Sequence, residues 1–135
     1  MEKTKLQEKI LEFNFLELQF NELEQNRATI EKEIAELKIL ELALEKLQEI
    51  KPNTEMFSQL GNDIFIKSKL KENEEVLVSI GSKIFVKKNI KEAQKSIETK
   101  IKNFEKIYKE IEGKMEELAS RLISLEKEIK GSSES

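Results

Sequence analysis

The chain has 135 residues, of which 38% are charged and 38% hydrophobic, with a formal net charge of −3. It contains neither Cys nor His, which excludes disulfides, thiolate metal sites, and the commonest general base and metal ligand of proteins. No apolar run approaches the roughly 20 residues of a membrane helix, and the charged N-terminus is unlike a signal peptide.

The first segment, residues 4–51, predicts one long helix. Thr4 and Gln7 have the spacing of a capping box, and Lys51-Pro52 ends the helix because Pro disfavours helix in the residue before it. Apolar residues recur in seven-residue rows, which is the pattern of a coiled-coil seam. Arg27, the one charged residue in these rows, either fixes the register of the helix pairing or extends its guanidinium to solvent. The rows are Leu6, Phe13, Phe20, Arg27 and Ile34, and Leu16, Leu23, Ile30, Leu37 and Leu44.

The middle of the chain, residues 52–88, contains an internal repeat with a period of 20 residues. Each copy has an apolar residue, a Gly and a small polar residue, followed by a run rich in β-formers. Gly61 and Gly81 at the first loop position predict two type II′ turns. We therefore expect two β-hairpins, in which residues 55–60 pair with 63–70 and residues 76–80 pair with 83–88.

The last segment, residues 89–130, predicts a second long helix. Asn89 and Glu92 suggest a capping box at its start, and Gly131 is a natural stop, so that residues 131–135 are expected to form a disordered tail. Gly113 falls on the outer face. Both seven-residue rows are entirely apolar or aromatic: Ile90, Ile97, Phe104, Ile111, Leu118 and Leu125, and Ile101, Tyr108, Met115, Leu122 and Ile129.

These segments predict a mainly α fold, a long antiparallel two-helix coiled coil whose helices are joined by two β-hairpins. Isolated hairpins are marginally stable in water, and their edges are free to pair with other chains. We therefore expect the hairpins of several subunits to join in a shared β structure. Its candidate residues are Met56, Leu60, Ile64, Phe65, Ile66, Val76, Val78, Ile80, Ile84, Phe85 and Val86.

The far end of the coiled coil, called the tip below, is where both ends of the chain are expected to meet. Leu11, Phe15 and Leu18 lie off the seam on the first helix, and Ile123 lies off the seam on the second. Exposed apolar clusters mark binding surfaces, although the same residues could instead pack against a neighbouring helix or simply tolerate exposure. The candidate tip residues are Leu6, Ile10, Leu11, Phe13, Phe15, Leu18, Leu122, Ile123 and Ile129.

Two heptad helices joined by two hairpins with the core LGNDIFIKSKL…VLVSIGSKIFVKKNIKEA (Leu60–Ala93) resemble the α-type subunit of prefoldin, and an archaeal rather than a eukaryotic one. The resemblance implies a cytoplasmic hexamer of two α-type and four β-type subunits, whose hairpins form a double β-barrel platform. It also implies that the tips of six coiled-coil tentacles bind unfolded client proteins without ATP and deliver them to a group II chaperonin. The tip and hairpin residues named above would then be the client-binding and platform residues.

Other functions are less well supported by the residues. An enzyme is not expected, because there is no Gly-rich phosphate loop, no metal-ligand spacing and a single Asp, and no cofactor is implied. Nucleic-acid binding is not expected either, since the chain is acidic overall and Lys83, Lys87, Lys88 and Lys91 suit an edge strand that resists aggregation. The main alternative is a structural scaffold, a prefoldin-like homo-oligomer or filament that would have no use for the off-seam tip residues.

Overall fold

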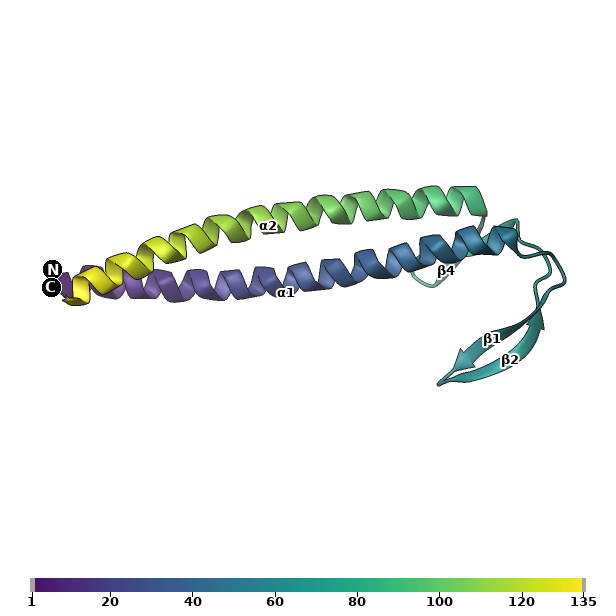
Figure 1. The fold of residues 1–135 in the computed structure, drawn as a ribbon, viewed down its shortest axis with the longest axis horizontal. Helices are drawn as coiled ribbons and strands as arrows, with labels where there is room; N and C mark the ends of the chain where they lie inside the picture. The colour runs from purple at the N-terminus through teal and green to yellow at the C-terminus, as the bar shows by residue number, and fades with distance from the viewer. Residues whose placement is uncertain (1, 135) are drawn as a thin grey trace. The chain divides into compact units, whose positions relative to one another are not determined.

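The computed structural model describes residues 2–134. In chain order the elements are α1 (Glu2–Glu49), β1 (Glu55–Gly61), β2 (Ile64–Lys69), β3 (Glu75–Gly81), β4 (Ile84–Asn89) and α2 (Ile90–Glu134), as Figure 1 shows. The two helices have 48 and 45 residues. The expected fold, two long helices joined by two antiparallel hairpins, is confirmed.

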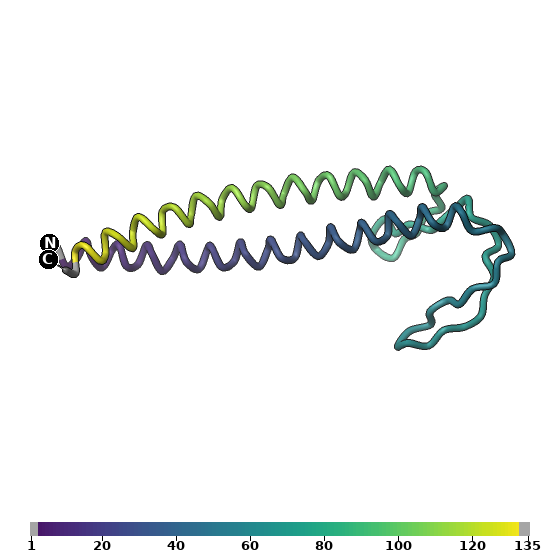
Figure 2. Tube along the Cα trace, in the orientation of Figure 1, coloured from purple at the N-terminus to yellow at the C-terminus, as the bar shows by residue number. Residues whose placement is uncertain are grey.

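The chain divides into two compact units that share both helices. One unit, the distal unit, comprises residues up to Ile34 and from Asn103 onward. The other, the hairpin unit, comprises Ala35–Lys102 and contains all four strands. The trace in Figure 2 follows α1 into the hairpins and back through α2.

In the distal unit, α1 and α2 pack antiparallel along their seams. Leu125 is fully buried and Met115 nearly so. Polar contacts lie at the seam's edges: Arg121 binds the Glu12 carboxylate through Nε at 3.1 Å and Nη2 at 3.3 Å, and Lys9 Nζ lies 3.7 Å from Glu128. The half-buried seam residues are Leu6, Phe13, Leu16, Phe20, Leu23, Arg27, Ile30 and Ile34 of α1, and Phe104, Tyr108, Ile111, Leu118, Leu122 and Ile129 of α2.

Both outer helix boundaries differ from the expected ones. The capping box at Thr4 is wrong, because α1 already begins at Glu2; the backbone N–H groups of an exposed first turn can bind water without a cap. The stop at Gly131 is also wrong, because α2 continues to Glu134. Gly131 lacks the positive φ by which Gly ends a helix, and one Gly inside a helix costs only about 1 kcal/mol. The expected tail is thus helical up to residue 134, and Ser135 lies outside the described residues.

Gly113 lies within α2, and a Cβ built there has no neighbouring atom within 4 Å. Replacing Gly113 by Ala is therefore expected to stabilise the helix by roughly 0.5–1 kcal/mol, because Ala loses less backbone entropy on folding than Gly. Thermal unfolding followed by circular dichroism should show a higher midpoint. An unchanged or lower midpoint would show that this part of α2 is not regular helix in solution.

In the hairpin unit, the two hairpins have the same register. Glu55 pairs with Lys69 in the first, and Glu75 pairs with Asn89 in the second, 20 residues later at both positions. Each hairpin carries one irregularity at its Gly, between Gln59 and Gly61 or between Ser79 and Gly81. The 20-residue repeat of the sequence is therefore a repeat of structure.

The predicted type II′ turns are wrong, and the loops lie one residue further along. Asn62 and Asp63 have φ values of 42° and 62°, and Ser82 and Lys83 have 50° and 60°. Positive φ at both central residues is the requirement of a type I′ turn. Gly61 (φ 140°) instead occupies the bulge, where a side chain would be strained, so the Gly serves the strand end rather than the loop.

The core of the hairpin unit lies where α1 and α2 meet β3. Leu44 of α1 and Ile90, Ala93, Ile97 and Ile101 of α2 form a buried cluster, against which Val76 and Val78 of β3 pack. The linker between the hairpins also contacts α1. Asn73 Nδ2 donates to the carbonyl oxygens of Gln48 (3.1 Å) and Ile50 (2.9 Å), where the last carbonyls of a helix lack intrahelical partners.

Asn89 ends β4 and caps α2, as expected. Its side-chain oxygen accepts a hydrogen bond from the Glu92 backbone N–H at 2.8 Å, and its Nδ2 donates to the Glu92 carboxylate at 3.1 Å. Replacing Asn89 by Ala is expected to lower the free energy of unfolding by about 1 kcal/mol, the usual cost of losing an N-cap. Chemical denaturation provides the measurement, and an Asn89→Ser variant, which retains a capping oxygen, should recover most of the loss.

Candidate functional site

The hairpins carry large apolar side chains that the chain itself does not cover. Every residue of β1 is exposed, and in β2 only Ser68 is partly covered. In the second hairpin, Val76, Val78 and Val86 are half-buried on the side facing the helix core, while the opposite side is exposed. Each hairpin therefore presents at least one apolar face to solvent.

The residues predicted for a shared platform fall into two groups. The exposed group has the properties that a subunit interface needs, and its role stays a prediction: Met56, Leu60, Ile64, Phe65, Ile66, Ile80, Ile84 and Phe85. The half-buried group, Val76, Val78 and Val86, already packs or lies partly covered within the chain. Two exposed residues were missed, Phe57 and Leu77. They are 20 residues apart, so aligning the two repeats would have found both.

A groove of about 430 Å³ runs beside the second hairpin in the same unit. Leu37, Leu40 and Leu44 of α1 form one side of it, β3 residues 76–79 another, and Ala93 and Ile97 of α2 the third. Ile39 and Leu42 are also exposed on α1. The nearly all-round apolar character of this stretch of α1 thus leaves uncovered surface close to the hairpins.

The tip belongs to the distal unit and has a different arrangement. Leu11, Phe15 and Leu18 are 68%, 60% and 69% exposed. At 3.6 residues per turn they share one face of α1, about half a turn away from the seam residues Phe13 and Phe20. This face is therefore directed away from α2, and it is a helix surface rather than a cleft.

The remaining predicted tip residues fall into two groups, those exposed outside the seam and those half-buried within it. Ile10 and Ile123 are exposed, and Ile123 lies on α2 between Arg121 and Glu128, whose partners are Glu12 and Lys9. Four predicted residues are instead half-buried within the coiled coil: Leu6, Phe13, Leu122 and Ile129. They are placed to support the tip, and their part in binding stays a prediction.

Polar contacts between the helices of the distal unit are at its surface. The Glu12 carboxylate raises the pKa of the Arg121 guanidinium through its hydrogen bond and its charge, and the guanidinium is charged at neutral pH with or without this shift. The pKa of Tyr108 is raised, mainly because the side chain is partly removed from water and also because its hydroxyl donates a hydrogen bond to Glu31 Oε1 (3.2 Å). Because its raised pKa keeps Tyr108 protonated in the fold, its contribution to stability is present below pH 10 and is lost as the pH rises further.

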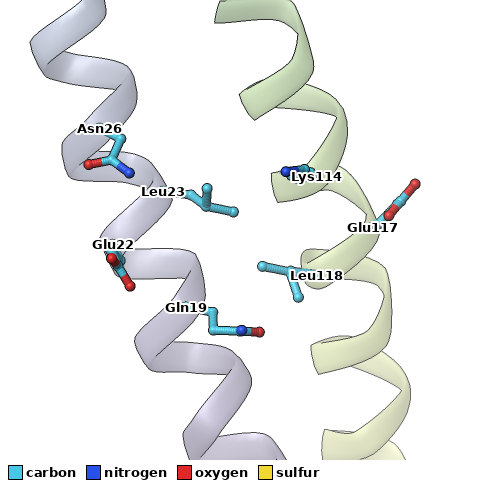
Figure 3. Close-up of a pocket in the computed structure, with 7 residues that line it drawn as sticks. All are labelled: Gln19, Glu22, Leu23, Asn26, Lys114, Glu117 and Leu118. Carbon is cyan, nitrogen blue, oxygen red and sulfur yellow. The ribbon is translucent and has the colours of Figure 1, made fainter. Parts of the chain in front are cut away.

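Two surface pockets of the distal unit combine apolar seam residues with charged side chains at the edges of the seam. A surface pocket of about 440 Å³ lies between the helices, and Figure 3 shows Leu23 and Leu118 pointing toward each other with polar side chains around them. Within residues 2–134 there is no group of three acidic, His or Cys side chains that could hold a metal ion. Over the same range no helix has the length and apolar character needed to cross a bilayer.

Comparison with known proteins agrees with this architecture. A search of curated proteins found no match to the sequence. Among solved structures, a filamentous PFD from Methanocaldococcus jannaschii, determined by cryo-electron microscopy, is similar to this chain with a TM-score of 0.75 and 21% sequence identity, over 90% of this chain and 98% of that one. Residues 16–134 match the prefoldin subunit family. Because this match takes in most of both helices and both hairpins, the chain belongs to the prefoldin subunit family.

Proposed function

We propose that the chain is the α-type subunit of an ATP-independent chaperone that holds non-native proteins at the tips of its coiled coils. The observation that carries the proposal is the row of exposed Leu11, Phe15 and Leu18 on a helix whose seam is already satisfied by α2. A coiled coil that served only as a spacer would be expected to carry polar residues there. Exposed apolar side chains are the chemistry that binds the apolar segments of unfolded chains.

The α-type assignment rests on the two hairpins. A subunit with two exposed hairpins, placed among partners with one, suits a hexamer of two α-type and four β-type subunits with a shared β-barrel platform. Client delivery to a group II chaperonin and a cytoplasmic location belong to the same proposal. Neither a membrane nor a nucleic acid is a proposed partner, and no catalytic step or cofactor is proposed.

The test is suppression of aggregation by the assembled protein. The chain is co-expressed with a one-hairpin prefoldin partner, and the native mass of the complex is measured. A chemically denatured protein is then diluted into the complex without ATP, and light scattering is followed. We expect a mass of two chains plus four partners, and scattering that falls as complex is added. Scattering equal to that with albumin at the same concentration would refute the chaperone proposal.

A second candidate function is a structural filament built from this chain alone. The specific observation in its favour is the similarity to a PFD whose structure is filamentous. The hairpins are compatible with such a filament, because each leaves an apolar face exposed. Native mass measurement of the chain expressed alone separates the candidates, since a ladder of growing oligomers favours the filament and a defined small species favours the hexamer subunit.

A further inference from the structure

The exposed face of α1 at the tip has a regular chemical order. Glu8, Leu11, Phe15, Leu18 and Glu22 follow one another in steps of three, four, three and four residues. This is the spacing of a coiled-coil seam, repeated on the side of the helix opposite the seam that α2 occupies. The row is about 21 Å long, at 1.5 Å per residue, and all five of its members are exposed.

The charges of α1 that follow Lys9 have one sign as far as Arg27, and Lys9 itself pairs with Glu128 of α2. Between Lys9 and Arg27 the helix carries four Glu residues and neither Lys nor Arg. Glu12 is engaged by Arg121, whereas Glu8 and Glu22 lie at the two ends of the apolar row. The row is thus an apolar strip of three residues with a carboxylate at each end.

We propose, on the basis of the proposed chaperone function, that this face binds clients as amphipathic helices whose apolar residues repeat in steps of three and four and whose ends carry Lys or Arg. Such a helix would pack its apolar residues beside Phe15 and place its cations near Glu8 and Glu22. A second copy of the same face is a poor occupant. Antiparallel pairing would bring Glu8 of one copy to Glu22 of the other, and parallel pairing would bring like residues together, so that either arrangement opposes like charges.

The proposal is tested with three fluorescent peptides of about five helical turns, measured by anisotropy with the assembled full-length chain. The first has Leu in steps of three and four with Lys at both ends, and the second replaces each Lys by Glu. The third has the composition of the first in an order that spreads the Leu around the helix. Two exposed ion pairs predict roughly threefold to tenfold tighter binding of the first peptide than of the second at low salt, and a smaller difference as salt is added.

Matched variants connect the preference to the row. Glu8→Gln with Glu22→Gln should abolish the preference for the Lys peptide, whereas Glu105→Gln with Glu110→Gln, an equal loss of exposed charge on α2, should leave it intact. Three outcomes would each overturn the proposal: the Lys and Glu peptides bind equally, the scrambled peptide binds as tightly as the first, or the Glu8/Glu22 variant keeps the preference. In each case the complex could still suppress aggregation, so the failure of this proposal is distinguishable from the failure of the chaperone proposal. If Leu11→Ser with Leu18→Ser lowered the native mass of the protein, a second copy would be the occupant, which also overturns it.

Discussion

Replacing Leu11, Phe15 and Ile123 together by Ser is expected to weaken client binding strongly while leaving the assembly intact. All three side chains are more than half exposed and lie off the seam, so their loss removes apolar contact surface without opening a cavity. If each contributes as an interface residue of about 1 kcal/mol, the affinity for a non-native client falls roughly a hundredfold. The measurement is light scattering of a diluted, denatured client, with native mass and helix content recorded in parallel.

The control for this experiment removes an exposed apolar side chain away from the tip row. Ile107 is 41% exposed on α2 in the same unit, so Ile107→Ser can be compared with Phe15→Ser one to one. The tip proposal requires that Phe15→Ser lower suppression more than Ile107→Ser does. Full suppression by the triple variant would show that clients bind elsewhere, and the groove beside β3 would then be the next surface to test.

Replacing Phe65 and Phe85 by Asp is expected to break the assembly into single chains. The two residues occupy equivalent positions of the repeat and are exposed in the isolated chain. In a shared β-platform each would be covered by a neighbouring subunit, and an unpaired carboxylate buried there costs several kcal/mol. Native mass spectrometry should show the loss of the oligomer, and circular dichroism should show that the helices remain.

A control for added charge is available in the turns of the same hairpins. Asn62 and Ser82 have positive φ at the turn centres, a conformation that Asp accepts more readily than most residues. Asn62→Asp with Ser82→Asp adds the same two charges and should leave the native mass unchanged. If the Phe65/Phe85 variant kept its native mass, the hairpins would not hold the subunits together.

The sequence was sufficient to predict the element types because the seam rows and the 20-residue repeat are strong periodic signals. It was less informative at element ends, where the competing conformations differ by about 1 kcal/mol, as at Gly131. The turns were misassigned by one residue because a Gly beside a small polar residue fits both the II′ loop and a bulge followed by a I′ loop. Asn73 was missed as a cap because its acceptors at the end of α1 and just beyond it, Gln48 and Ile50, are more than twenty residues away in sequence.

Within the candidate tip surface, the sequence predicted the off-seam residues better than the residues near the seam. Off-seam apolar residues such as Leu11 and Leu18 are visible as departures from the heptad pattern. Phe13 and Leu122 were grouped with them by position along the helix, although both residues are half-buried in the seam between α1 and α2. Periodicity predicts which side of a helix a residue occupies. The extent to which a partner helix covers that residue depends on the pairing register, and a contact that reports the register, such as Arg121 with Glu12, joins residues more than a hundred positions apart in the sequence.

The identical register of the two hairpins has a consequence for the size of any assembly. A chain that presents two copies of one joining element is divalent, like a bifunctional monomer in a polymerisation. If hairpins join like with like, divalent chains alone continue to add to one another, whereas a subunit with one hairpin is monovalent and terminates growth. The ratio of the two kinds of subunit would then decide between an open polymer and a closed particle, without any change in the contact itself.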